Sequence, residues 1–282
     1  FSAFGTEVTQ LNRSSRLLRG VDEEVVARFE EAASKQWNIV KDASLSEIRE
    51  NADGSVTVVA KRTSENGEEL LEIPADAVLV ATGRRPNTDT LNAKNYFDVQ
   101  EGGQLSVDKY QRVLYNGAPV PGVYALGDVS SRYQLKHVAN HEARVVQHNL
   151  SHPEDLRASD HRYVPGAVFS NPQIAVVGMT EEQARQAAER EGFEITVKAQ
   201  NFGDTAYGWA MEDKIGLCKL IARKDNGELL GAHLVGEESS VLIQPLLQAM
   251  SFGMDARALA RGQYWIHPAL TEIVENALLG LE

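Results

Sequence analysis

GVYALGD, at residues 122–128, is the stretch that does most to indicate the fold. Its apolar residues run together up to a glycine and an aspartate, a pattern typical of a parallel strand that is buried on both faces. In open α/β folds, ligands bind beyond the carboxyl ends of such strands. We therefore expect Asp128 to accept hydrogen bonds from ligand hydroxyls, although an aspartate that only caps a loop would give the same pattern.

The residues on the amino-terminal side of this strand predict a mixed arrangement. ADAVLVATG, at residues 75–83, predicts a second strand buried on both faces. Before it, residues 44–73 predict a three-stranded antiparallel meander with turns at Asp53–Gly54 and Asn66–Gly67. Apolar residues at helical spacing predict a helix from Asp22 to Asn38.

The chain starts with FSAFGTEVTQLNR and not with Met. This stretch predicts the last turn of a helix over residues 1–4, a left-handed cap at Gly5 and a short strand over residues 8–12. We therefore expect the chain to begin inside a strand–helix–strand unit, after the unit's first strand and glycine turn.

On the carboxyl-terminal side, a linker rich in Gly, Pro and Asn precedes the GVYALGD strand, and a helix rich in His and Arg follows it over residues 135–150. Polar residues then indicate a boundary near residue 160. Beyond it, an antiparallel α+β domain is predicted. Its predicted strands are AVFS, QIAVVG, EITVKA, IGLCKLIA and LLGAHLVG. One predicted helix begins at a Thr180–Gln183 capping box, and two more cover about 239–252 and 268–280.

Composition bounds the class of protein. A chain of 282 residues has room for about two domains at roughly 150 residues each. Its 28 basic and 40 acidic residues give a net charge of −12, which opposes binding to nucleic acid or to an anionic membrane. Cys218 is the single cysteine, so the chain has no internal disulfide and no CxxC pair, and a reducing, cytoplasmic location is expected.

Three strings, ATGRRPN, GVYALGD and YWIHPALTE, occur in this order along the chain. In order and spacing they resemble the flavoprotein disulfide reductases, the family of glutathione reductase, lipoamide dehydrogenase and mercuric reductase. The resemblance covers the whole chain. It implies an α/β fold, in which incomplete FAD- and NAD(P)-binding Rossmann-like domains are followed by an α+β dimerisation domain with an antiparallel sheet. The implied domains are a partial NADPH-binding domain at 1–88, part of the FAD-binding domain at 89–158 and the interface domain at 159–282.

His267 and Glu272 are the candidate catalytic residues. Pro268 suits the first helical position, so we expect His267 at a helix entry and Glu272 about one turn inside the helix, near enough to fold back. A carboxylate on one imidazole nitrogen leaves the other free to protonate a departing thiolate. A helix-capping histidine with an unrelated glutamate is the alternative. The resemblance implies an acid–base pair that acts in the active site of the opposite subunit of a homodimer.

The end of the first strand indicates the choice of nucleotide. Relatives selective for NAD carry an acidic residue there, whereas this chain has Asn12 followed by basic residues. Guanidinium groups match phosphate geometry, so we expect NADPH, bound by Arg13, Ser14 and Arg19, with Arg16 in solvent. A basic surface loop without a ligand is the alternative.

The resemblance also implies a set of FAD contacts. It implies that Asp128 contacts the ribityl chain of the flavin and that the first-turn amides of the helix after it face the pyrimidine oxygen of the flavin. Lys136 and His137 differ from the small or apolar residues that many family members have there. The residues carried over to the cofactor sites are Gly83, Gly127, Asp128, Leu135, Lys136 and His137.

The remaining histidines and one arginine have no assigned chemistry. His141 and Arg144 face either the nucleotide or solvent. His152, His161 and His233 have no metal-ligand spacing between them, so we expect structural roles and no metal site.

Two family motifs are missing from the sequence. It contains neither the first GxGxxG for FAD nor a CxxxxC pair that exchanges electrons with the substrate. We therefore expect the chain to be the C-terminal part of a longer NADPH-dependent flavoenzyme that reduces a low-molecular-weight disulfide, and to be inactive by itself. The alternative is a non-catalytic dimerisation module without a bound cofactor.

Overall fold

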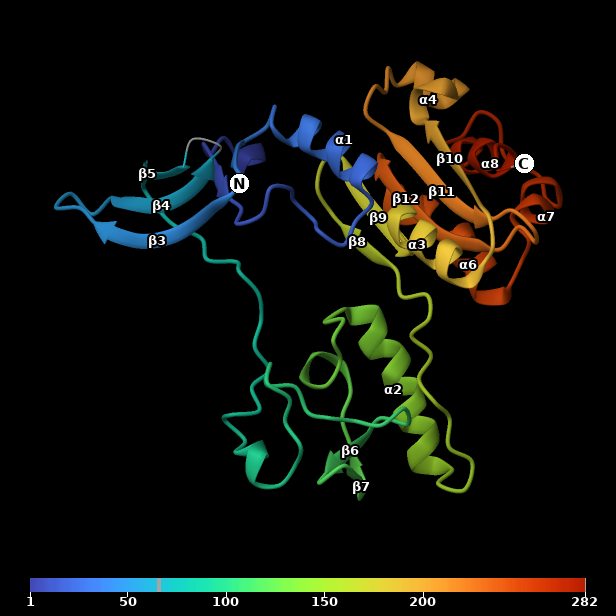
Figure 1. The fold of residues 1–282 in the computed structure, drawn as a ribbon, viewed down its shortest axis with the longest axis horizontal. Coiled ribbons are helices and arrows are strands. Elements are labelled where there is room, and N and C mark those ends of the chain that lie inside the picture. Colours follow the sequence, from blue (N-terminus) through green and yellow to red (C-terminus); the bar gives the residue numbers. More distant parts are fainter. Residues whose placement is uncertain (65–66, 282) are drawn as a thin grey trace. The chain divides into compact units, whose positions relative to one another are not determined.

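The structure of the chain is a computed structural model that describes residues 1–64 and 67–281 (Figure 1). By its internal contacts the chain divides into two compact units. Unit 1 consists of residues 1–79 and 165–282, and unit 2 of residues 80–164. The domain bounds expected from the sequence, 1–88, 89–158 and 159–282, stay a prediction.

Unit 1 contains most of the regular structure. Its helices are α1 (Glu23–Ala33), α3 (Glu181–Glu191), α4 (Ala206–Ala210), α5 (Ser239–Leu242), α6 (Gln244–Phe252), α7 (Ala256–Arg261) and α8 (Glu272–Leu279), with 3-10 helices at Ser2–Phe4 and Phe202–Asp204. Its strands are β1 (Thr9–Leu11), β2 (Asn38–Val40), β3 (Ala43–Glu50), β4 (Val56–Ser64), β5 (Gly67–Ala75), β8 (Gly166–Val168), β9 (Gln173–Gly178), β10 (Ile195–Asn201), β11 (Leu217–Arg223) and β12 (Leu229–Gly236). Unit 2 contains α2 (Lys136–Ser151), β6 (Arg112–Tyr115), β7 (Ala118–Tyr124) and 3-10 helices at Ala93–Asn95 and Gly127–Val129.

The main sheet of unit 1 confirms the predicted antiparallel α+β domain. Its strands lie in the order β10-β11-β12-β9-β8, and all neighbours run antiparallel. Consecutive residues of β11 and β12 are buried, as their continuous apolar sequences predict. Helix α8 contacts β10 and β11, while α6 contacts β12. These contacts give unit 1 a core built around the two central strands.

Helix α1 covers part of the same sheet, although it lies far from it in the sequence. The helical spacing expected for its apolar residues is confirmed, and they pack against side chains of β9, β11 and β12. This core cluster includes Val25, Val26, Phe29, Ile174, Leu217 and Val235. The predicted helix end at Asn38 is wrong, because α1 ends at Ala33 and residues 38–40 form β2, which pairs in parallel with β1.

Local turn and cap signals are confirmed where the structure describes them. Ser2–Phe4 forms a helical turn that ends at Gly5 in the left-handed conformation. β3, β4 and β5 form the antiparallel meander, and the Asp53–Gly54 turn joins the first two strands. Asn66 of the second expected turn lies outside the described residues. Thr180 and Gln183 form the capping box at the start of α3.

The observed helices differ from the sequence analysis in two predicted ranges and in two short helices that were not predicted. The expected helix over 239–252 is divided into α5 and α6, and Pro245 lies in the first turn of α6, where a missing N–H is tolerated. The expected helix over 268–280 begins only at Glu272. The short helices α4 and α7 were not expected, because five or six residues are too few to show a helical period.

The prediction that ADAVLVATG forms a buried strand is wrong. No strand is assigned to residues 77–82, and Leu79 and Val80 are 72% and 67% exposed. A buried parallel strand needs a neighbour on each side to take up its backbone hydrogen bonds. No described residue pairs with this segment, so its apolar side chains remain in contact with solvent.

The prediction that GVYALGD forms a buried parallel strand is also wrong. Its first residues belong to β7, which pairs antiparallel with β6 in a two-stranded sheet and is largely exposed. The linker expected before it is the turn of this hairpin, because Asn116 and Gly117 both have positive φ, as a two-residue hairpin turn requires. The Asn-Gly dipeptide was therefore the local signal for the hairpin.

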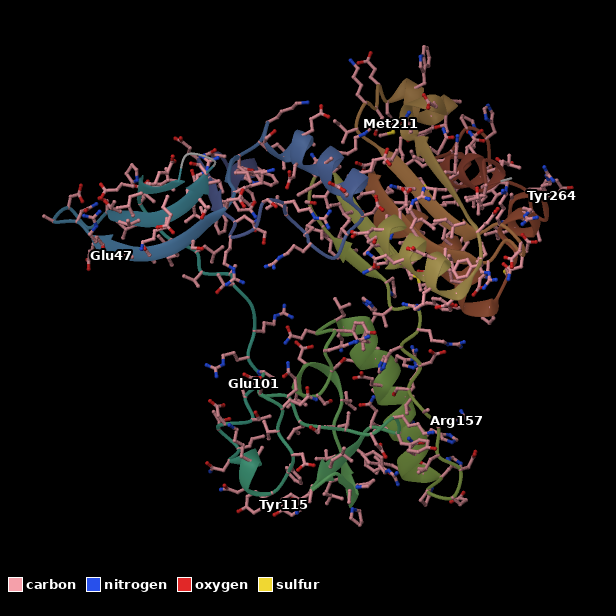
Figure 2. The ribbon with its side chains drawn as sticks, in the orientation of Figure 1. Glu47, Glu101, Tyr115, Arg157, Met211 and Tyr264 are labelled. Carbon is pink, nitrogen blue, oxygen red and sulfur yellow. The ribbon has the colours of Figure 1, made fainter. Side chains whose placement is uncertain are left out.

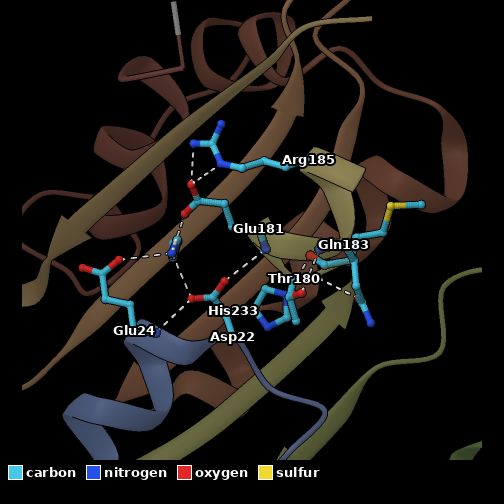
Figure 3. A network of polar contacts seen from close by, with 9 residues as sticks. Asp22, Glu24, Thr180, Glu181, Gln183, Arg185 and His233 are labelled. Carbon is cyan, nitrogen blue, oxygen red and sulfur yellow. Dashed lines mark hydrogen bonds and ion pairs between the residues drawn. The ribbon is translucent and has the colours of Figure 1, made fainter. Parts of the chain in front are cut away.

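A buried ion network joins α1 to the sheet and to α3 (Figure 3). Lys219 belongs to β11, and its side chain is 7% exposed. Its Nζ atom lies 2.9 Å from Asp22 Oδ1 and 2.7 Å from Glu181 Oε2. Glu24 Oε2 lies 3.2 Å from the same Nζ. Asp22 also caps α1 through the Glu24 N–H and accepts the N–H of Glu181, so it contacts the starts of both helices.

The environments of Lys219, Asp22 and Glu181 stabilise the charged forms of these three groups. Burial by itself lowers the pKa of Lys219, but its hydrogen bonds to Glu181 and Asp22 outweigh burial, and the pKa is raised. Burial raises the pKa of Asp22, but the Glu181 N–H and Lys219 outweigh it, and the pKa is lowered. The hydrogen bond from Lys219 likewise lowers the pKa of Glu181. Lys219, Asp22 and Glu181 are therefore charged near neutral pH.

We predict that Lys219→Met destabilises the folded chain by about 3–5 kcal/mol, because Asp22 would stay buried without a counter-charge, whereas Glu181 would keep its ion pair with Arg185. The measurement is urea unfolding at pH 7, followed by circular dichroism. Lys224→Met is the matched control, because Lys224 forms an exposed pair with Glu194 and such pairs contribute about 1 kcal/mol or less. Equal losses of stability in the two variants would contradict the importance of the buried network.

The difference in stability between wild type and Lys219→Met should become smaller at acidic pH. The folded pKa values of Asp22 and Glu181 lie below their ordinary values of 3.8 and 4.5, so their contribution is present above about pH 4.5 and is lost as the pH falls through the lowered values. In Lys219→Met, protonation instead relieves the unpaired, buried carboxylate of Asp22. The stability gap between wild type and Lys219→Met should therefore narrow on acidification from pH 6 to about pH 3. A gap that stays constant over this range would show that the loss is not electrostatic.

Candidate functional site

His267 and Glu272 lie in contact in unit 1. His267 Nδ1 and Glu272 Oε1 are 2.7 Å apart, and the Ala269 N–H donates a hydrogen bond of 3.3 Å to Glu272 Oε2. The two side chains are 69% and 17% exposed, respectively. The expected helix entry at His267 is wrong, because residues 268–271 form turns and Glu272 is the first residue of α8. The carboxylate reaches the imidazole across these turns.

This arrangement assigns different tasks to the two ring nitrogens of His267. In the neutral imidazole, a carboxylate at Nδ1 favours the proton on that nitrogen and leaves Nε2 as an acceptor. Nε2 has no partner among the residues that the structure describes. His267 can therefore take up or release a proton at Nε2, while Glu272 stabilises the imidazolium form.

A cavity of about 510 Å³ lies beside the imidazole. His267 and Pro268 line one part of it, and residues 203–207, 209 and 210 line the rest. Tyr207 and Trp209 of α4 are exposed in this wall. The sequence analysis missed these residues, since α4 is too short to be recognised from periodicity. The cavity gives a ligand access to the side of His267.

The loop after β1 carries the predicted nucleotide-binding residues. Arg13 and Arg19 are exposed, and Ser14 is half-buried. The guanidinium groups of Arg13 and Arg19 form no hydrogen bond or ion pair with any residue in the described part of the chain. Arg16, expected in solvent, is half-buried and donates to the Arg19 carbonyl at 3.2 Å. Two unpaired cations on one short loop are suited to an anionic group.

The predicted flavin contacts lie in unit 2. Asp128 belongs to the 3-10 helix Gly127–Val129, and its Oδ2 is 3.4 Å from Nη1 of Arg84. Both side chains are exposed, so this ion pair is weak and leaves the carboxylate accessible. Arg84 follows Gly83, which is also exposed, and the sequence analysis did not identify its contact with Asp128.

Gly127 is held in place by a buried carboxylate. Its N–H donates a hydrogen bond of 2.7 Å to Glu142 Oε2, while Glu142 Oε1 lies 3.0 Å from His161 Nε2. Gly127 has φ +70°, and an added Cβ would lie 3.2 Å from Ala139 Cβ. The sequence analysis missed Glu142, although it is the one acidic residue among the buried positions of α2, and that position was a usable signal.

The start of α2 presents backbone donors. Leu135 is the N-cap and makes no side-chain capping bond, and Lys136 and His137 are the first helical residues, both exposed. The first-turn N–H groups therefore suit a ligand acceptor. His141, one turn further, is half-buried and accepts the Asp160 N–H at 3.3 Å, whereas Arg144 is exposed.

The other candidate groups have structural contacts. His161 contacts Glu142, His152 stacks on His148, and the buried His233 contacts the Met179 carbonyl at 2.9 Å. Burial lowers the pKa of His233 and raises the pKa of the Cys218 thiol, so neither group is reactive near neutral pH. Within the described residues there is no cluster suited to a metal ion and no helix long and apolar enough to cross a membrane.

We predict that Glu142→Ala destabilises unit 2 by about 1–3 kcal/mol, because the buried Gly127 N–H would lose its acceptor. Hydrogen exchange of the Gly127 amide should increase in the same variant. Glu154→Ala, an exposed substitution shortly after α2, is the control and should change neither quantity. Unchanged exchange at Gly127 in Glu142→Ala would contradict the role of Glu142.

Comparisons with known proteins show what the whole chain is similar to. Mycothione reductase of Mycobacterium tuberculosis (strain ATCC 25618 / H37Rv) is 51% identical to the chain over 285 residues, which cover 100% of the chain and 58% of that protein. Dihydrolipoyl dehydrogenase of Synechocystis sp. is 31% identical, with 98% of the chain and 58% of that protein covered. The chain thus spans less than two thirds of the length of these relatives.

A solved structure and two family models extend the likeness. The HOCl-induced flavoprotein disulfide reductase of Escherichia coli has a TM-score of 0.84 and 27% identity, and the match covers 100% of the chain and 61% of that structure. Residues 1–143 match the pyridine nucleotide-disulphide oxidoreductase model, and residues 164–278 match the dimerisation domain of the same proteins. These matches confirm the fold class and the resemblance derived from the sequence, and the chain belongs to the pyridine nucleotide-disulphide oxidoreductase family.

Proposed function

We propose that the chain is part of an NADPH-dependent FAD enzyme that reduces a low-molecular-weight disulfide to two thiols. The observation that carries this proposal is the His267–Glu272 contact of 2.7 Å beside an open cavity. The 51% identity to mycothione reductase supports mycothione as the disulfide and mycothiol as the product. The reaction consumes one NADPH and one proton for each disulfide and yields two thiols and NADP⁺. The hydride of NADPH provides both electrons and one of the two thiol hydrogens, and the proton provides the other.

The protein groups at the cavity account for the proton transfer. Attack on the substrate by a thiolate from the rest of the complete enzyme would form a mixed disulfide and release the other sulfur as a thiolate. Protonation of this leaving group makes the exchange favourable. His267 Nε2 would donate that proton, because Nδ1 is already in contact with Glu272. Glu272, which is largely buried, would stabilise the imidazolium before the transfer.

The residues of unit 2 fit one side of a flavin site. FAD, when bound, would pass electrons from NADPH to the disulfide. The exposed Asp128 carboxylate would accept hydrogen bonds from ribityl hydroxyls, and the uncapped first turn of α2 would donate to a ring oxygen. Gly127 brings the backbone close to Ala139, where a Cβ would be in tight contact.

We also propose that the enzyme is a cytoplasmic homodimer in which His267 acts in the active site of the partner subunit. The match to a dimerisation domain supports this assembly. Three exposed apolar side chains lie near His267: Trp209 lines the same cavity, and Tyr264 and Ile266 shortly precede His267 in the sequence. A second copy of the chain would cover them. Met211 and Tyr264, which are labelled in Figure 2, are exposed residues of unit 1 as well. The single cysteine, Cys218, is buried, as suits a reducing compartment.

We predict that His267→Ala in the complete enzyme lowers disulfide turnover by about 10²–10⁴-fold, because proton delivery is lost. Reduction of the bound flavin by NADPH, followed by its absorbance in a stopped-flow instrument, should be unchanged. Glu272→Gln should cost less, since the imidazole remains. His152→Ala is the control for loss of an imidazole elsewhere. Normal disulfide turnover by His267→Ala would refute the acid–base assignment.

We predict that replacing Arg13 and Arg19 by Ala raises the KM for NADPH and leaves the KM for NADH nearly unchanged. Each lost contact with the 2′-phosphate should cost about 1.5–3 kcal/mol, the range for a hydrogen bond to a charged group. Arg190→Ala, on the exposed surface of α3, is the control. Equal losses with the two nucleotides would mean that these arginines have a structural role.

A further inference from the structure

The side chain of Asn12 organises the loop that follows β1. Its Nδ2 atom donates one hydrogen bond of 2.7 Å to the Ser14 carbonyl and another of 3.0 Å to the Arg16 carbonyl. Both hydrogens of the amide are therefore used to curl the loop back over the end of the strand. Asn12 is half-buried beneath this turn.

The main chain of Asn12 gives this contact a fixed base. The Asn12 N–H donates to the Val40 carbonyl at 2.8 Å, and its own carbonyl accepts the Ala43 N–H at 3.1 Å. These residues belong to β2 and β3, so Asn12 is attached to two neighbouring elements. The side-chain amide of Asn12 therefore holds the loop in a fixed position relative to β2 and β3.

A second contact supports the far side of the loop. The N–H of the buried Leu17 donates a hydrogen bond of 2.8 Å to Glu30 Oε1, and Lys41 Nζ lies 2.8 Å from Glu30 Oε2. The loop backbone is therefore tied to α1 as well as to β1. The charged side chains of Arg13 and Arg19 extend from the loop without a hydrogen-bond or ion-pair partner in the described part of the structure.

We propose that Asn12 is a positioning residue for recognition of the nucleotide 2′-phosphate and thereby determines part of the preference for NADPH. The inference rests on the proposed use of NADPH by the complete enzyme. Two donors on one nitrogen suit two carbonyls that lie two residues apart along the chain. With these bonds in place, the loop backbone that carries Arg13 and Ser14 and leads to Arg19 is ordered before the nucleotide binds, which lowers the cost of binding.

The inference separates two effects that a residue at this position can have. An acidic residue at the end of this strand binds ribose hydroxyls in NAD-selective proteins and repels a 2′-phosphate through its charge. Asn12 does more than lack that charge, because it contributes two donors. A carboxylate has no donor, so aspartate would lose both bonds and face two carbonyl oxygens.

The test measures binding of 2′,5′-ADP and 5′-AMP to the complete enzyme by titration calorimetry. Asn12→Ala removes the donors without adding charge, and Asn12→Asp removes them and adds charge. Asn38→Ala on β2 is the matched control, because the exposed Asn38 amide makes only a contact of 3.5 Å with Thr9. The KM and kcat values for NADPH and NADH are measured on the same samples.

Asn12→Ala should weaken binding of 2′,5′-ADP by about tenfold and raise the KM for NADPH by a similar factor. The affinity for 5′-AMP and the kcat with saturating NADPH should stay unchanged, and Asn12→Asp should have the larger effect. Asn38→Ala should resemble wild type. A role in stability alone would not produce this dependence on the 2′-phosphate.

Three results would overturn the inference. If Asn12→Ala binds 2′,5′-ADP normally and only Asn12→Asp is weakened, charge alone accounts for the preference. If Asn12→Ala loses affinity for 2′,5′-ADP and 5′-AMP equally, the amide has a general structural role. If wild-type enzyme does not bind 2′,5′-ADP more tightly than 5′-AMP, the proposed use of NADPH fails first, and this inference fails with it.

Discussion

An ammonium group buried among carboxylates is the interaction on which unit 1 depends. Lys219 lies in the central strand β11, and its partner Asp22 is 197 residues away in the sequence. A charge this deeply buried is unfavourable unless its partners are in place, so α1 and the sheet have to fold together. Asp22 also accepts the N–H of Glu181, and the starts of α1 and α3 are thereby fixed by one carboxylate.

The same carboxylate fixes one end of the loop that we assign to the nucleotide. The loop runs from Asn12, whose main chain is bonded to β2 and β3, to Asp22 at the start of α1. Between these ends, Leu17 is buried and bonded to Glu30. A segment anchored at both ends and in the middle has few backbone conformations, so holding its backbone in place around a ligand costs little further entropy. The ion network and the loop with the candidate phosphate site therefore share Asp22 as a fixed point.

The His267–Glu272 contact depends on a turn and would be lost in a regular helix. Residues five positions apart in a continuous helix point about 140° away from each other, so their side chains lie on different faces. The turns at 268–271 instead let the Glu272 carboxylate reach His267 Nδ1. Because α8 starts at Glu272 and packs on β10 and β11, the carboxylate is fixed by the main sheet. The imidazole remains exposed, which leaves its other nitrogen accessible to a ligand.

The sequence by itself determined the features that depend on near neighbours in the chain. The capping box of Thr180 and Gln183, the meander and the antiparallel sheet all follow from local pattern, and the residue types at 267 and 272 identified the candidate pair. Tertiary structure alone decided whether an apolar run becomes a buried strand. The segments 77–82 and 122–128 have a suitable composition, but a strand also needs partners for its backbone groups. Among the described residues, no strand pairs with the first segment, and the second contributes only to an exposed hairpin. The sequence likewise shows a lysine within the apolar strand β11, but the carboxylates that it meets are distant in the chain, so only folding could select them.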